Sequence, residues 1–128
     1  MRLLLDTHAL LWWFLDDPAL SGLARNVIAD PESEVVVSAV SAMEITTKFR
    51  RGRLPAAASL ASGFVSMVED YGFTALPISL DHASLAGSLA FDHRDPFDRL
   101  LISQALIEKL TLVSNERVFD ATGVSRLW

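Results

Sequence analysis

Short apolar runs alternate with helical patterns along the chain. Runs typical of buried strands lie at residues 3–5, 35–37, 73–76 and 112–113, and an edge strand is expected at 125–127. Apolar residues at helical spacing predict helices over residues 8–14, 21–29, 38–51, 56–71, 81–89 and from 96 onward, with a helical turn near 118. Parallel strands need crossover connections of this length, so this order predicts one three-layer α/β/α domain over residues 1–128 with a mainly parallel central sheet.

Two predicted helix starts carry polar residues that can cap them. Either Asp6 or Thr7 can cap the helix that begins near residue 8, and either Ser38 or Ser41 can cap the helix after the second strand. Gly52 is typical of the residue that ends a helix. The capping residues follow buried strands directly, so they are expected at the carboxyl edge of the sheet.

Composition narrows the function classes. The 128 residues are 51% hydrophobic and carry a net charge of −5, so the chain can bury a core but lacks the basic field of a non-specific nucleic-acid binder. It has no cysteine, which excludes disulfides, thiolate metal sites and cysteine nucleophiles and agrees with a reducing cytoplasm. Any polyanionic ligand must therefore bind to a local cluster of basic residues.

The mean hydropathy of +0.32 is high for a soluble domain. The longest apolar run, residues 9–15, is far shorter than the roughly 20 residues that a membrane-spanning helix needs. The pattern of residues 1–5 is not the one expected of a signal peptide, because Asp6 interrupts the apolar stretch. We therefore expect a cytoplasmic protein whose surplus apolar surface contacts a protein partner.

Acidic residues gather at the predicted carboxyl edge. Asp6 follows the first strand, Glu44 lies one to two turns into the helix after the second, and Glu116 comes shortly after the fourth. Asp95 and Asp98 open the helix that precedes the fourth strand. Clustered carboxylates repel one another unless cations neutralise them, and their hard oxygen atoms suit Mg²⁺ or Mn²⁺. Such ions commonly serve phosphoryl transfer or phosphodiester cleavage.

Each acid also has an ordinary structural explanation. Asp6 can be a helix N-cap, and Ser41 with Glu44 fits the S-x-x-E capping box. The two acids around residue 96 can complement a helix dipole, and Glu116 can be a solvated loop residue. Their joint placement at one edge of the sheet is the feature that favours a shared site.

Three segments closely resemble the PIN-domain ribonucleases, and in particular the VapC-like toxins. They are L-L-D-T-H-A-L-L-W-W at residues 4–13, S-A-V-S-A-M-E-I at 38–45 and H-R-D-P-F-D-R-L-L-I-S-Q-A at 93–105. The resemblance implies a PIN-like domain and a Mg²⁺- or Mn²⁺-dependent endoribonuclease that acts as the toxin of a toxin–antitoxin pair. It also implies three partners: an RNA substrate, a cognate antitoxin and a second copy of the chain.

Carrying over the family's acidic quartet gives Asp6, Glu44, Asp98 and an acid after the strand at 112–113. Where the family often has Thr-x-Asp, this chain has Ser-Asn-Glu ending at Glu116. We expect Asp6 and Asp98 to hold the ion directly, while Glu44, Asp95 and Glu116 complete its coordination through waters. A longer glutamate side chain at position 116 can reach the ion through water.

Basic and aromatic residues leave several interpretations open. The cluster Lys48, Arg50, Arg51 and Arg53 is either a solvated helix end or a contact for the RNA phosphate backbone. The aromatic residues at 12–14 are expected in the core or in an interface rather than as a base-stacking platform. The three histidines lack zinc-site spacing, so His8 and His93 are assigned local hydrogen bonds or a supporting role beside the acids.

Two other function classes compete with the nuclease. A non-catalytic PIN-fold binding module agrees with the altered fourth acid. A phosphoacceptor signalling domain needs an aspartate directly after the third strand, where this chain has Leu76 and Pro77. The run at residues 10–15 is apolar around the whole helix, which predicts that part of it is covered by another chain in a homodimer.

Overall fold

The computed structural model describes residues 1–128 and contains a five-stranded sheet in the order β3-β2-β1-β4-β5. Every pair of neighbouring strands is parallel. The strands are β1 (Arg2–Leu5), β2 (Glu34–Ser38), β3 (Thr74–Leu76), β4 (Thr111–Val113) and β5 (Arg126–Leu127). The predicted α/β class and parallel sheet are confirmed.

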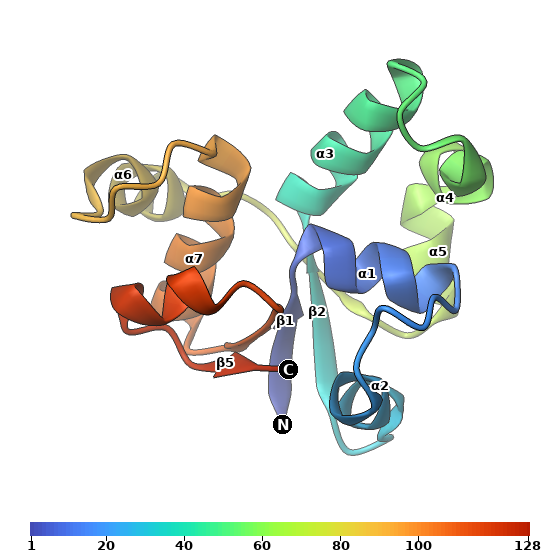
Figure 1. The fold of residues 1–128 in the computed structure, drawn as a ribbon, viewed down its shortest axis with the longest axis horizontal. Coiled ribbons are helices and arrows are strands. Elements are labelled where there is room, and N and C mark those ends of the chain that lie inside the picture. Colours follow the sequence, from blue (N-terminus) through green and yellow to red (C-terminus); the bar gives the residue numbers. More distant parts are fainter.

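Helices cover both faces of this sheet (Figure 1). One side carries α1 (Thr7–Phe14), α2 (Gly22–Ala29), α4 (Ala58–Ser62) and α5 (Phe64–Asp70), with a 3₁₀ turn at Pro55–Ala57 before α4. The other side carries α6 (Leu80–Ser88), α7 (Pro96–Glu108) and the 3₁₀ helix Arg117–Thr122. The helix α3 (Ala39–Arg50) rises directly from the end of β2. None of these helices is both long and apolar enough to cross a membrane.

Two apolar clusters lie on opposite faces of the sheet. Leu3 and Leu5 of β1 pack into the cluster under α1 and α2, while Leu4 packs with Leu101 and Phe119 on the other face. Successive strand residues point to opposite faces, so a strand covered on both sides needs apolar residues at every position. This double burial explains why the strands are continuous apolar runs in the sequence.

The structure changes two of the predicted local features. The helix expected over 56–71 is broken into a 3₁₀ turn, α4 and α5, because the backbone of Gly63 leaves the helical conformation at φ −135° and ψ 37°. The capping-box interpretation of Ser41 and Glu44 is wrong. Ser38 caps α3, and Ser41 lies inside that helix, where its hydroxyl is 3.1 Å from the Thr7 hydroxyl of α1.

The aromatic end of α1 is covered largely by its own chain. Trp12 meets the ring of Trp128 edge-on, and Trp13 packs near Tyr71 and Phe73. Trp12, Trp13 and Phe14 all pack against the cluster under α1. These contacts confirm the core assignment and remove much of the uncovered surface that the sequence predicts for this helix.

We predict that Leu4→Ala lowers the free energy of unfolding by about 2–5 kcal/mol, because it leaves a cavity in the central strand. Leu4 is 0% exposed, whereas Leu80, the first residue of α6, is 90% exposed. Leu80→Ala is therefore the matched control and should change stability by no more than about 0.5 kcal/mol. Urea denaturation followed by circular dichroism measures both, and equal effects would contradict the described core.

Candidate active site

Three helices begin at the carboxyl end of the sheet. The helices α1 and α3 start directly after β1 and β2, and the N-terminal end of α7 lies at the same end of the sheet (Figure 1). α3 packs against both α1 and α7. Ligands of parallel α/β sheets bind in the crevice beyond the carboxyl ends of the strands. The acids predicted from the sequence lie in this region.

Asp6 is the most deeply buried of these acids, with 4% of its surface exposed. It caps α1, and its Oδ1 atom accepts a hydrogen bond from the Ala9 amide at 2.7 Å. Burial raises the pKa of Asp6 to about 6, although the Ser114 and Ala9 hydrogen bonds and the charge of His8 oppose this rise. The negative charge of Asp98 raises the pKa further. Asp6 is therefore both an N-cap and a member of the acidic group.

Asp98 lies in the first turn of α7 and contacts a histidine from the preceding loop. The His93 Nε2 atom is 2.8 Å from Asp98 Oδ2. Burial raises the pKa of Asp98, and the negative charges of Asp95 and Glu44 raise it further, while the His93 contact lowers it. Asp98 thus interacts electrostatically with both Asp6 and Glu44.

Glu44 reaches this group from the middle of α3. It is buried, and its Oε2 atom pairs with Lys48 Nζ at 2.6 Å, one helical turn further along. Lys48 is grouped by sequence with the arginines as a candidate RNA contact, and in the structure its ammonium group binds the Glu44 carboxylate. The i,i+4 spacing of the two residues is a signal for this pair that the sequence analysis did not use.

Asp95 and Glu116 lie outside the buried group. Asp95 is exposed and caps α7, accepting hydrogen bonds from the amides of Phe97 and Asp98. Its charge still raises the pKa of Asp98, so it borders the group. Glu116 is also exposed, and its backbone amide donates to the Ser114 hydroxyl at 3.1 Å. Its carboxylate contacts none of the other acids.

Ser114 is a site residue that the sequence analysis missed. It is fully buried, follows β4 directly, and its side chain forms a hydrogen bond with Asp6 that lowers the pKa of that carboxyl. Its position as the first residue after a buried strand was the available signal. The polar side chain that follows β4 in this group is thus a serine, and the expected acid lies two residues later on the surface.

The acids suit a hard divalent cation by their chemistry, although no group of three or more His, Asp or Glu side chains is arranged to hold a metal ion. Asp6, Glu44 and Asp98 offer only carboxylate oxygens, the donors that Mg²⁺ and Mn²⁺ prefer. Their burial and mutual repulsion raise two of their pKa values, and a cation would relieve both effects. The donor set therefore fits such an ion.

The remaining basic residues lie at the far end of α3. Arg50, Arg51 and Arg53 are exposed and form no ion pair. A rise of 1.5 Å per residue puts the end of the helix about 10 Å beyond Glu44. Three positive charges thus remain accessible near the acidic group.

A family model described as the PIN domain matches residues 3–124. This chain belongs to the PIN-domain family. Among curated protein sequences, none matches it. The match covers the residues from β1 to just before β5, and it includes every acid of the candidate site.

Solved structures of VapBC, VapC and Fit proteins share the fold of this PIN domain. VapBC2 from Rickettsia felis, bound to a promoter DNA fragment, matches with a TM-score of 0.72 and 15% identity over 99% of this chain and 98% of that chain. VapC20 from Mycobacterium tuberculosis, described as a sarcin-ricin loop cleaving toxin, matches with a TM-score of 0.69 and 18% identity over 95% of each chain. FitAcB from Neisseria gonorrhoeae matches with a TM-score of 0.68 and 15% identity over 98% of this chain and 96% of that chain. The resemblance to VapC-like PIN proteins is confirmed at the level of the fold.

We predict that Asp6→Asn stabilises the protein more at neutral pH than at pH 4. The folded pKa of about 6 lies above the ordinary 3.8, so the folded state binds more protons and wild-type stability falls as pH rises between these values. Asparagine removes the charge and keeps an oxygen for the Ala9 amide. The free energy of unfolding of Asp6→Asn should exceed that of wild type by an amount that grows as pH rises from 3.8 to about 6. This difference should reach at most about 3 kcal/mol and then level off.

Urea denaturation between pH 4 and pH 8 measures this difference, with Asp120→Asn as the control. Arg126 lowers the pKa of Asp120 below its ordinary 3.8, so the stability that this carboxylate contributes is already present at pH 4 and is lost only at lower pH. Its asparagine variant should therefore lose nearly the same stability at pH 4 as at pH 8. Parallel profiles for wild type and Asp6→Asn would contradict the electrostatics of the site.

Proposed function

We propose that this PIN domain is a Mg²⁺- or Mn²⁺-dependent endoribonuclease that acts as the toxin of a toxin–antitoxin pair. The observation that carries the proposal is the electrostatic contact of Asp98 with both Asp6 and Glu44 at the carboxyl end of a parallel sheet, where burial and repulsion disfavour the charged forms of Asp6 and Asp98. The structural likeness to VapC20, a toxin described as cleaving the sarcin-ricin loop, supports RNA as the substrate class.

Each acid has a distinct part in the proposed reaction. Asp6 and Asp98 would hold the ion directly, with Asp95 at the border of the site and Glu44 and Glu116 acting through waters. A bound ion of this kind supplies an activated water and stabilises charge on the phosphate. The Ala9 amide and the Ser114 side chain fix the Asp6 carboxylate, and His93 fixes that of Asp98. Arg50, Arg51 and Arg53 would contact the RNA backbone.

We predict that the purified protein cleaves RNA with Mg²⁺ or Mn²⁺ and that EDTA abolishes cleavage. Asp6→Asn and Asp98→Asn should each lower the cleavage rate by at least roughly 100-fold, because each removes a charged oxygen ligand. Asp95→Asn and Glu116→Gln should lower the cleavage rate less, since both residues are exposed and lie outside the group formed by the other three acids. Mapping new 5′ ends in total cellular RNA measures cleavage and locates the cut sites.

Asp120→Asn is the matched control, because Asp120 is an exposed aspartate that pairs with Arg126 rather than with the acidic group. It should cleave as fast as wild type. Cleavage in EDTA would refute the metal mechanism. A folded wild-type protein that cleaves no RNA with either ion would favour the non-catalytic binding module.

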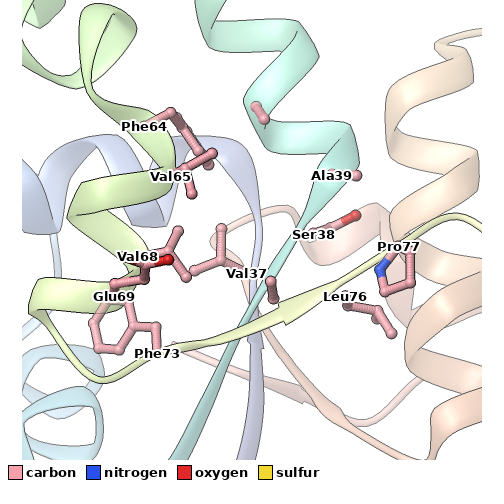
Figure 2. Close-up of a pocket in the computed structure, with 12 residues that line it drawn as sticks. Val37, Ser38, Ala39, Phe64, Val65, Val68, Glu69, Phe73, Leu76 and Pro77 are labelled. Carbon is pink, nitrogen blue, oxygen red and sulfur yellow. The ribbon is translucent and has the colours of Figure 1, made fainter.

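An apolar groove beside the edge strand β3 is the docking site that we propose for the antitoxin. The groove has a volume of about 400 Å³. Figure 2 shows Phe64, Val65 and Val68 of α5 along one wall, with Val37 and Pro77 on the floor and the opposite wall. Four of the structurally similar proteins were solved as VapBC, FitAB or toxin–antitoxin assemblies, which supports an antitoxin segment as the occupant.

The groove adjoins the acidic group through α3. Ser38 lines the groove and caps the helix that carries Glu44. An antitoxin segment seated there can extend a basic side chain toward Asp6, Glu44 and Asp98, where it would replace the cation. Antitoxin binding and Mn²⁺ binding would then exclude each other.

We predict that Val65→Glu prevents antitoxin binding, because Val65 is 72% exposed at the groove and a buried carboxylate there would lack a partner. Leu80→Glu on α6 is the control, since Leu80 is exposed but does not line the groove. Co-expression with the product of the neighbouring small reading frame and light scattering measure complex formation. Binding by Val65→Glu at wild-type strength would place the antitoxin elsewhere.

The same light-scattering measurement tests a homodimer, which we propose to form through a helical surface. The apolar end of α1 is already packed against its own chain, so an exposed side chain on another helix, such as Leu23 on α2 or Met43 on α3, is the better contact. A monomeric mass at micromolar concentration would contradict the homodimer.

A further inference from the structure

The loop between α6 and α7 carries a histidine that contacts Asp98. Residues 89–95 form no helix or strand, yet they carry His93 to the Asp98 carboxylate and end at the α7 cap, Asp95. Within the loop, the one backbone hydrogen bond runs from the His93 amide to the Phe91 carbonyl at 2.9 Å. The position of His93 therefore depends on contacts that come from outside the loop.

Arg99 supplies most of these contacts. Its Nε donates to the Ala86 carbonyl at 2.8 Å, and Nη2 donates to the Leu89 carbonyl at 2.7 Å. Its Nη1 donates to the carbonyls of Phe91 at 2.5 Å and His93 at 3.1 Å. The first two bonds satisfy carbonyls at the end of α6, where the last carbonyls of a helix lack partners within the helix. The other two continue along the loop as far as His93, which capping α6 does not require.

Arg99 makes no contact with any carboxylate. It forms no ion pair, and its neighbour Asp98 points in another direction because consecutive helical residues do not face each other. The planar guanidinium holds several acceptors at fixed angles, a task that a lysine ammonium does not reproduce. All the guanidinium's hydrogen bonds in the structure thus go to the backbone between α6 and His93.

Aromatic packing completes the placement of the His93 ring. The ring stacks on Phe91 with centroids 5.3 Å apart, and Phe119 meets it edge-on at 5.7 Å. Phe91 also meets Phe119 edge-on. Arg99 fixes the carbonyls of both Phe91 and His93, so it sets the two backbone positions from which this stack is built. The His93 Nε2 atom is thereby aimed at Asp98.

We propose that Arg99 is a positioning residue for the Asp98 carboxylate, acting through the loop carbonyls and the His93 ring. The inference rests on the proposed function, in which Asp98 belongs to the cleavage site. It adds a route by which a residue that touches none of the acids controls cleavage. Partners that orient a ligating residue in this way typically change activity by roughly 10- to 100-fold when replaced.

The test combines Arg99→Lys, His93→Ala, the double variant and His93→Gln, with Arg94→Lys as the matched control. Arg94 is an exposed arginine of the same loop that makes no hydrogen bond through its side chain. We expect Arg99→Lys to lower kcat roughly 10- to 100-fold with little change in KM. It should add nothing in the His93→Ala background. His93→Gln can still donate a hydrogen bond to Asp98, so it should retain much of the activity that His93→Ala loses.

Nitrogen NMR of the histidine rings supplies a readout that does not need RNA cleavage. The chain has three histidines, so the spectrum is simple. Arg99→Lys should shift the ring signals of His93 and leave those of His82 in place, because His82 lies on α6 with its own partners Ser79 and Glu108. Arg94→Lys should move neither set of signals. Equal shifts of His82 and His93 would indicate general loosening and overturn the inference.

Multiplicative losses in the double variant would also overturn the inference, since they mean that Arg99 does not act through His93. If Arg99→Lys does not fold, Arg99→Gln, which keeps an amide donor, takes its place in every measurement. A wild-type protein without ribonuclease activity refutes the proposed function, whereas unmoved His93 signals in a folded Arg99 variant refute the positioning role. The two failures are therefore distinguishable.

Discussion

The buried carboxylate of Asp6 is the constraint on which the rest of the site depends. It stands at the end of the central strand β1, where a parallel sheet brings the carboxyl ends of β2 and β4 alongside it. Burial there disfavours its charged form, and the charge of Asp98 adds to the cost. The surrounding structure lowers this cost through the Ala9 amide at the start of α1 and the Ser114 side chain after β4.

The other two acids of the group, buried Glu44 and half-buried Asp98, have partners of their own. Lys48 neutralises Glu44 from one turn along α3, and His93 contacts Asp98 from the loop before α7. Each carboxylate therefore has a neighbour that orients it. This arrangement keeps three acids close together inside an apolar fold, and it connects the chemistry of the site to the loop that Arg99 holds in place. Stability and function are in this sense opposed at Asp6, where an uncharged residue suits the fold better and a charged one suits the proposed reaction.

Local pattern predicts the structure correctly where it coincides with topology. The runs at 3–5 and 35–37 are buried on both faces, so periodicity alone identified β1 and β2 and placed Asp6 beyond the end of β1. Local pattern misleads where two residues offer the same local role. Ser41 with Glu44 satisfied the capping-box spacing, but Ser38 caps α3 and leaves Ser41 free to meet Thr7. A single glycine, Gly63, divided a helical pattern that the sequence presents as continuous.

Apolar periodicity and chain direction predict the layered parallel fold, the order of its elements and the placement of Asp6, Glu44, Asp95 or Asp98, and Glu116 at one edge of the sheet. The resemblance to the PIN-domain ribonucleases is what singled out the acids of the expected quartet. Which distant polar groups lie beside those acids follows from the tertiary structure. Glu116 stays on the surface, and Ser114 takes the place beside Asp6. The reason is physical: burial and hydrogen-bond partners depend on residues distant in the chain, and no local pattern specifies which side chains will share the low-dielectric space at the end of β1.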